Sequence, residues 1–303
     1  MQTVRSQSSE VPTGHRSGFV AIIGRPNVGK STLLNQVLGQ KVAIVTPKPQ
    51  TTRGRILGIL TLPDAQIIFV DTPGLHRPRS MVNQRMVEAA ERAAAEADVR
   101  LWVVDAQAGI TAGDRAIAVQ LQGTAETCVA LNKIDGLPRN ALLPLLAALD
   151  EMLPGRHVIP VSALRKTNFN ELLEQLVRLL PVGPRYYDPE VFTDQTERLL
   201  AQEVIREKVL LQTEAEVPYA VAVTIDQFED KGKVAVISAT IHVERASQKA
   251  IVIGAGGKRI KEIGRAARIE LEALLGRRLY LEVFVRVQEE WTKRRALLKE
   301  FGF

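Results

Sequence analysis

The stretch that decides the fold is Gly24-Arg25-Pro26-Asn27-Val28-Gly29-Lys30-Ser31, which fits the phosphate-loop pattern GxxxxGK[ST] at every required position. It directly follows the apolar run 19–23 and leads into an amphipathic stretch. Glycines let backbone N–H groups surround a polyphosphate, and the N-terminus of a following helix favours anions. A strand, this loop and a helix in succession therefore predict a phosphate-binding site.

Residues at the end of this loop have separate expected roles. Lys30 places a positive charge beside the β- and γ-phosphates, and the Ser31 hydroxyl suits Mg²⁺. We also count Thr32, the next residue, among the nucleotide-binding residues.

Length and composition bound the class of protein. The 303 residues are comfortable for two domains, and the hydrophobic fraction of 46% is ordinary for soluble globular proteins. No apolar run approaches the roughly 18 residues that cross a membrane. Residues 1–17 are polar and Ser-rich, so we expect a disordered tail rather than a secretory signal. The single cysteine, Cys128, is expected to be buried and not catalytic, and the absence of paired cysteines fits a reducing cytoplasm.

Residues 18–180 alternate β-branched runs with helical patterns, which predicts an α/β domain with a mostly parallel sheet and helices on both faces. The second and third expected strands are separated by hairpin length, so we expect one antiparallel pair. The expected strands are 19–23, 55–62, 66–71, 99–105, 127–131 and 157–161, and the expected helices are 31–38, 81–96, 113–122, 140–153 and 168–180.

The Pro-rich residues 181–190 are expected to form a short stiff linker to a second domain, 191–303. The pattern there is α-β-β-α-α-β-α, which predicts an α+β fold. The expected helices are 193–212, 246–252, one that ends near 275 and 290–299, and the expected strands are 219–228, 233–243 and 279–287.

Two further segments of the first domain suit Mg²⁺ and a γ-phosphate. Asp71-Thr72-Pro73-Gly74 closes an apolar strand, where a carboxylate can reach Mg²⁺ through water and Gly74 lets an N–H approach the γ-phosphate. The Pro- and Thr-rich connection 46–52 reads as a mobile loop. We take Thr52 rather than Thr51 as the threonine that binds Mg²⁺ when a γ-phosphate is present, which would make this loop an order–disorder switch.

One segment, Asn132-Lys133-Ile134-Asp135, indicates which base of the nucleotide is bound. Guanine presents adjacent N1–H and N2–H₂ donors that the Asp135 carboxylate can accept together, whereas adenine has an acceptor at N1. An ATP-dependent enzyme is therefore disfavoured, and the remaining alternative is an ordinary turn after a strand. Ser162-Ala163-Leu164 also follows an expected strand but is too short to be evidence alone.

Together these five segments resemble the motifs of translation-factor-class small GTPases. The resemblance implies GTP or GDP with Mg²⁺ as ligands, an Ala163 N–H that serves the guanine carbonyl, and Lys133 against the base. One departure is Leu75, which stands where a water-orienting glutamine would be and cannot orient water.

Families with an apolar residue at that place often carry an asparagine in the phosphate loop that helps hold K⁺, and Asn27 has that position. We therefore expect slow, potassium-stimulated hydrolysis, with Lys30, Thr52, Gly74 and Asn27 as the catalytic residues. The alternative is that Asn27 only shapes the loop.

The second domain contains one strongly basic segment, residues 245–268, with seven Lys or Arg and one acid. Within it lies Ile253-Gly254-Ala255-Gly256-Gly257-Lys258, a GxxG loop that opens a basic helix. The loop and the order of elements resemble the type II KH fold. Such a loop presents N–H groups and helix dipoles to phosphates of single-stranded RNA, and the groove beside it accepts unstacked bases.

Lys258 and Lys261 are the expected phosphate contacts, which predict salt-sensitive binding without sequence preference. Ile253 and Ile260 either line the groove or pack in the core. Trp291 has two interpretations, stacking on a base and anchoring the last helix, of which we favour the second.

A GTPase domain followed by a KH domain is the arrangement of a family of bacterial ribosome-assembly GTPases, and the similarity covers nearly all of the chain after Ser17. It implies binding to the 3′ end of small-subunit ribosomal RNA in the small ribosomal subunit. It also implies a cytoplasmic protein, expected to be a monomer, that associates peripherally with the inner face of the membrane. We expect GTP to order the loop around Thr52 and thereby control RNA access at 254–257. The competing class is an RNA-binding protein whose nucleotide domain is a static, GTP-stabilised scaffold.

Overall fold

The first sheet is mostly parallel, as its β-branched runs predict. The computed structural model describes residues 14–48, 51–74, 81–123, 126–214 and 217–302. The strand order is β2-β3-β1-β4-β5-β6, and only β2 and β3 pair antiparallel, as expected from the short connection between them. The strands are β1 Arg16–Ile23, β2 Ile56–Thr61, β3 Ala65–Asp71, β4 Val99–Asp105, β5 Glu126–Asn132 and β6 His157–Pro160.

Helices cover both faces of this sheet, because alternate residues of each buried strand point to opposite sides. On one face, Val20 and Ile22 of β1 pack in a cluster with α1 and α5. On the other, Ala21 and Ile23 lie in a cluster with α3 and α4. The helices are α1 Lys30–Leu38, α2 Met81–Glu96, α3 Ala112–Leu121, α4 Leu142–Met152 and α5 Phe169–Leu179.

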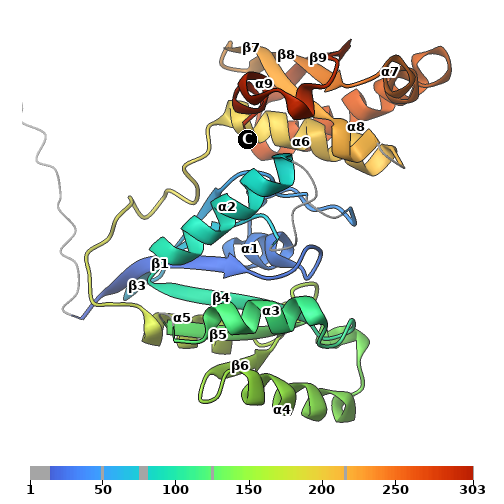
Figure 1. The fold of residues 1–303 in the computed structure, drawn as a ribbon. Coiled ribbons are helices and arrows are strands. Elements are labelled where there is room, and N and C mark those ends of the chain that lie inside the picture. The colour runs from blue at the N-terminus through green and yellow to red at the C-terminus, as the bar shows by residue number, and fades with distance from the viewer. Residues whose placement is uncertain (1–13, 49–50, 75–80, 124–125, 215–216, 303) are drawn as a thin grey trace, which may run out of the picture.

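The segment after α5 lies along the first domain before it reaches the second (Figure 1). The buried side chain of Gln66 accepts hydrogen bonds from the Tyr186 and Tyr187 N–H groups, at 2.8 and 3.0 Å. Further along, the Ile59 N–H of edge strand β2 donates to the Phe192 carbonyl at 2.8 Å. The expected linker 181–190 is therefore bonded to the first domain at Tyr186 and Tyr187.

The second domain is a three-stranded sheet, β7-β8-β9, with α6 and α8 packed on one face. Strands β7 and β8 are antiparallel, and β8 and β9 are parallel. The elements are α6 Glu197–Gln212, the 3₁₀ turn η3 Val217–Ala220, β7 Ala222–Asp230, β8 Val234–Val243, α7 Ala246–Ile253, the 3₁₀ turn η4 Ala255–Gly257, α8 Lys258–Leu275, β9 Arg278–Val287, the 3₁₀ turn η5 Trp291–Lys293 and α9 Arg295–Glu300.

Two expected helices of this domain have different bounds. Helix α6 begins at Glu197 rather than at 193, because the Thr193 hydroxyl bonds the Leu57 carbonyl at 2.7 Å and Thr196 caps the helix. The single helix expected over 290–299 is two short elements, since Glu290 has a φ of 50° and Arg294 is extended.

Candidate nucleotide and nucleic-acid sites

The phosphate loop is tightly packed against the rest of the first domain. Gly29 has a φ of 99°, and a Cβ there would lie 2.4 Å from Asn132 Nδ2, so a side chain has no room. Lys30 is only 7% exposed, and its Nζ donates to the carbonyls of Gly24 and Arg25 at 3.2 and 3.1 Å. Burial lowers the pKa of Lys30 to about 8, against a weaker raising effect of Asp71. The lysine therefore lies where it can meet a polyphosphate in the loop.

The three expected Mg²⁺ residues come together at one point. Ser31 Oγ donates to Asp71 Oδ2 at 2.7 Å and lies 2.9 Å from Thr52 Oγ1, which is 3.2 Å from the same Asp71 oxygen. Burial raises the pKa of Asp71, although Lys30 opposes this. Two hydroxyls and one carboxylate form an all-oxygen set, which is the donor chemistry that Mg²⁺ prefers. Thr51 instead bonds Thr46 Oγ1, so the geometry favours Thr52 over Thr51.

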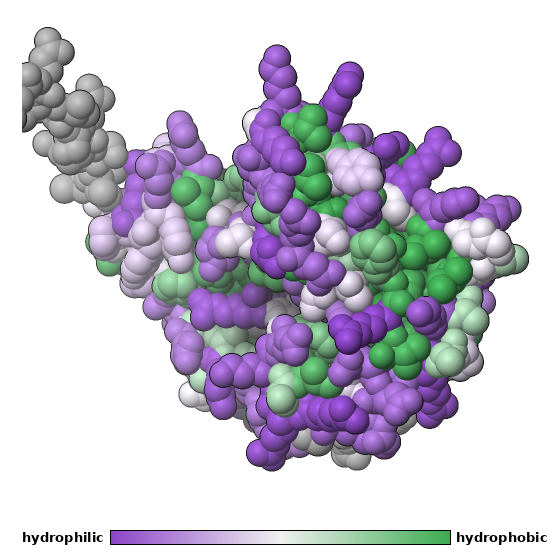
Figure 2. Space-filling model, turned by 90° about the horizontal axis from the view of Figure 1, so that it is seen from above, coloured by the Kyte–Doolittle hydropathy of each residue, from purple (hydrophilic) through white to green (hydrophobic). Residues whose placement is uncertain are grey.

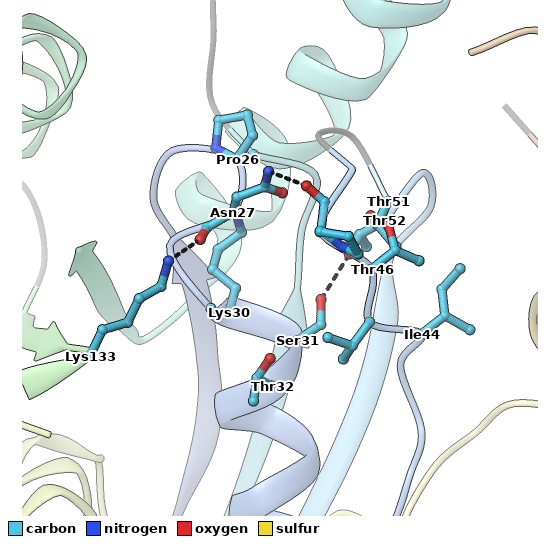
Figure 3. A pocket seen from close by; sticks show the side chains of 14 residues that line it. Pro26, Asn27, Lys30, Ser31, Thr32, Ile44, Thr46, Thr51, Thr52 and Lys133 are labelled. Atoms are coloured by element: carbon cyan, nitrogen blue, oxygen red, sulfur yellow. Dashed lines mark hydrogen bonds between the residues drawn. The ribbon is translucent and has the colours of Figure 1, made fainter. Parts of the chain in front are cut away.

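The expected nucleotide site consists of two adjoining cavities. A cavity of about 490 Å³ lies between the phosphate loop and residues 44–47 and 51–52 (Figure 3). A second, of about 280 Å³, is lined by the Asn132–Asp135 segment and Ala163. Both are lined by Gly29, Thr32 and Lys133, so they meet at the phosphate loop. The first suits phosphates and the second suits a base.

Asp135, the predicted base-reading carboxylate, is held by another motif. Ser162 Oγ donates to Asp135 Oδ1 at 2.5 Å, which gives the serine a positioning role that the sequence did not reveal. Asn132 ties the segments together, since its Nδ2 donates to the Val28 carbonyl and its Oδ1 accepts from the Ala163 N–H, both at 2.9 Å. The Ala163 N–H expected to serve guanine thus has an asparagine partner here.

Lys133 lines both cavities at the point where they meet. It has a φ of 67°, and its Nζ donates to the Asn27 carbonyl at 2.7 Å and to Asp105 Oδ2 at 2.5 Å. Asp105 belongs to none of the five motifs. The signal that could have found it is its position at the carboxyl end of strand β4, where ligand sites of parallel sheets gather.

Asn27 bridges the phosphate loop and the loop that carries Thr52. Its Nδ2 donates to the Pro47 carbonyl at 2.9 Å (Figure 3). Gly74 lies close by, because a Cβ there would come within 2.6 Å of the Pro26 nitrogen. Leu75, which we expected in place of a water-orienting residue, lies outside the described residues.

The GxxG loop has the tight geometry that its glycines predict. Gly254, Gly256 and Gly257 all have positive φ, and a Cβ on Gly254 would lie 2.8 Å from Arg259 Cβ. The Arg259 guanidinium donates to the Ile251 carbonyl at the end of α7, so it braces the loop. The loop therefore tolerates little change in backbone shape.

The two expected phosphate contacts, Lys258 and Lys261, are exposed, and Ile253 and Ile260 are half-buried. Figure 2 looks down on this domain: hydrophilic side chains cover most of the face, with apolar patches between them. Trp291 is fully buried, with its Nε1 donating to the Ala220 carbonyl at 3.1 Å, so it anchors the C-terminal segment and the stacking alternative is wrong.

Cys128 is buried in β5, and burial raises the pKa of its thiol to about 12, so it is not a reactive thiolate. No helix within the described ranges is both long and apolar enough to cross a membrane.

The fold and the two sites define a P-loop GTPase joined to a KH domain. The family model described as a 50S ribosome-binding GTPase matches residues 19–133, and a KH domain model matches residues 216–292. The chain is 47% identical to GTPase Era of Geobacter metallireducens over 95% of this chain and 98% of that one. GTPase Era of Heliobacterium modesticaldum is also 47% identical, over 95% of this chain and 97% of its own.

Solved structures agree. A crystal structure of Era with MgGDPNP and nucleotides 1506–1542 of 16S ribosomal RNA aligns with a TM-score of 0.92 at 41% identity, over 95% of this chain and 99% of that one. An Aquifex aeolicus Era variant bound to GDP and AlF₄⁻ aligns with a TM-score of 0.91 at the same identity and coverage. The chain belongs to the Era family of GTPases.

Proposed function

We propose that this GTPase is a Mg²⁺-dependent switch that controls binding of its KH domain to the 3′ end of small-subunit ribosomal RNA during assembly of that subunit. The observation that carries the proposal is that the loop around Thr52 lines the nucleotide cavity and also bonds the KH domain. The Era crystallised with MgGDPNP and 16S RNA supports the choice of ligands.

The side chains at the nucleotide site have distinct tasks. Asp135 accepts the paired donors of guanine and is oriented by Ser162. Lys30 places its charge against the phosphates. Ser31, Thr52 and Asp71 would hold Mg²⁺, which when bound neutralises charge on the β- and γ-phosphates. Gly74 packs against Pro26 of the phosphate loop, and its N–H would donate to the γ-phosphate.

The residue after Thr52 provides the link to the KH domain. Arg53 donates to the carbonyls of Val221 and Pro218, at 2.5 and 3.2 Å, on the segment that enters β7. Burial, followed by repulsion from Arg206, lowers the pKa of Arg53 to about 9. A shift of Thr52 on loss of the γ-phosphate would therefore pull directly on these contacts.

A second link runs through α2, which follows the Asp71–Gly74 segment and points toward the KH domain (Figure 1). Met86 of α2 packs in a buried cluster with Trp291, Leu298 and Phe301. The loop around Thr52, through Arg53, and helix α2, through Met86, thus each touch the KH domain. This double contact favours a switch over a static scaffold.

A Lys30→Ala variant tests the switch against the scaffold. The switch predicts loss of GTP turnover and of nucleotide-dependent RNA binding, while RNA binding without nucleotide stays as in the wild type. The scaffold predicts mainly a lower melting temperature, with RNA affinity independent of nucleotide in both proteins.

We further propose that K⁺ accelerates hydrolysis. Asn27 has a φ of 64° and lies between the phosphate loop and Pro47, where its amide oxygen can contribute to a cation site beside the phosphates. Turnover should be higher in KCl than in NaCl at equal ionic strength, and Asn27→Ala should remove the difference. Equal rates for the wild type in the two salts would refute the proposal.

The family resemblance also supports a cytoplasmic monomer that touches the inner face of the membrane peripherally. Light scattering after size exclusion tests the oligomeric state. Flotation with vesicles of anionic lipid tests membrane contact, and a protein that stays entirely at the bottom of the gradient would refute it.

A further inference from the structure

Two neighbouring charged residues of the KH domain are almost completely buried. Arg206 and Glu207, on helix α6, are each 2% exposed. Charged side chains are rarely buried to this degree unless they are paired. Neither belongs to the GxxG loop or to a GTPase motif, and both form bonds to residues of the first domain.

Their partners are the two ends of one loop of the nucleotide site. Arg206 Nη2 donates to the Thr51 carbonyl at 2.6 Å, and Glu207 Oε1 accepts from the Val45 N–H at 2.9 Å. Val45 and Thr51 both line the nucleotide cavity, and Thr51 immediately precedes Thr52. Helix α6 therefore binds the backbone of the nucleotide site at two points, Val45 and Thr51.

Both anchors are held in place from within the interface. Arg206 Nε donates to Glu203 Oε1 at 2.9 Å on the same helix. Glu207 Oε2 is bound by Lys41 of the first domain and by Lys208, each at 2.7 Å, and both lysines also bind Glu270 of α8. Side chains that are already fixed lose little entropy when they bind the backbone of Val45 and Thr51, so these two residues are held firmly.

We propose that Arg206 and Glu207 are positioning residues of the GTP site, through which the KH domain holds Val45 and Thr51 at the nucleotide cavity and raises the affinity for GTP relative to GDP. The inference rests on the GTP-binding function, but it does not require that nucleotide control RNA binding. It assigns to the RNA-binding domain a part in nucleotide discrimination, because Thr52 is needed only when a γ-phosphate is present.

The test uses the full chain with Arg206→Gln and Glu207→Gln, each made singly. Affinities for a non-hydrolysable GTP analogue and for GDP are measured in Mg²⁺ by fluorescence. We expect the GTP analogue to bind about tenfold more weakly, as for one lost charge-assisted hydrogen bond, with GDP affinity within about twofold of the wild type. Arg295→Gln, an exposed charge of the same domain, is the matched control and should change neither affinity.

Melting temperatures show whether each variant is folded, and Glu207→Gln alone decides the test if Arg206→Gln unfolds. A GTP-to-GDP affinity ratio equal to the wild type in the folded variants would overturn the inference. The proposed control of RNA binding is judged separately, from RNA affinity of the wild type in its two nucleotide states. Either can therefore fail without the other.

Discussion

Arg25 of the phosphate loop donates through Nε to Asp114 Oδ2 over 2.8 Å, and this carboxylate lies fully buried at the start of α3. The same oxygen accepts from the N–H and hydroxyl of Thr111, which completes the helix cap. Gly113 leaves room for the arginine, since a Cβ there would lie 2.7 Å from Arg25 Cδ. Helix α3 thus supports the phosphate loop through Asp114, a residue that lies outside the GTPase motifs.

Asp114→Asn should weaken this brace. The amide can still cap α3 but cannot balance the Arg25 charge, so we expect a loss of about 3 kcal/mol in the free energy of unfolding and weaker GDP binding. Urea denaturation and nucleotide titration measure the two effects. Thr111→Val is the control, because it removes only the cap hydroxyl and should cost about 1 kcal/mol. Equal losses in the two variants would contradict a special role for the ion pair.

Asp135→Asn should change the base that is recognised. An amide offers one donor and one acceptor, so it mismatches the paired donors of guanine but can donate to a base with a carbonyl at C2, as in xanthine. We expect GTP affinity to fall by about 100-fold or more and xanthosine triphosphate to bind better than GTP. Competition binding with the two nucleotides measures this. An unchanged preference for GTP would place the base elsewhere.

The lowered pKa of Lys30, about 8 in the nucleotide-free protein, predicts a pH dependence of binding. The protonated amine binds phosphate, and bound phosphate keeps it protonated. As pH rises through 8 the free protein loses this proton, so nucleotide binding takes up a proton and GDP affinity falls above pH 8. Calorimetry in two buffers of different ionisation enthalpy, from pH 7 to about 8.8, measures the uptake. Binding without proton uptake would show that Lys30 stays charged.

Gly254→Ala should damage the RNA site selectively. The added Cβ would meet Arg259 Cβ at 2.8 Å in a backbone with a φ of 73°, so the GxxG loop must change shape. We expect RNA affinity to fall at least about tenfold while GTP turnover is retained. Gly276→Ala is the matched control, since it has a φ of 65° but open space around the new atom. RNA binding lost equally in both variants would indicate general destabilisation.

Local sequence patterns predicted most of the fold and those site residues that are adjacent to one another in the sequence. The strand that ends at Asp71 and the glycines of 254–257 follow from hydrophobic runs and spacing. Asp105, Asp114 and the α6 pair Arg206 and Glu207 could not be found in this way. Each acts on a segment far away along the chain, and no spacing rule marks a charged residue that becomes useful only when two elements pack together.

The start of helix α6 is also set by a contact with a segment far away along the chain. The sequence from 193 is compatible with a helix, but the Thr193 hydroxyl bonds the Leu57 carbonyl of β2, and Thr196 then supplies the cap. Tertiary contact decides the boundary here, as it does where Trp291 enters the buried cluster with Met86.

The central claim is that the nucleotide controls RNA binding through the loop that carries Thr52. The most direct test is the affinity of the full chain for an RNA with the 3′-terminal sequence of small-subunit ribosomal RNA, measured at one salt concentration with Mg²⁺ and either GDP or a non-hydrolysable GTP analogue. The switch predicts tighter binding with the analogue, by about fivefold or more. Equal affinities in the two states would contradict it and leave the static scaffold as the function of the first domain.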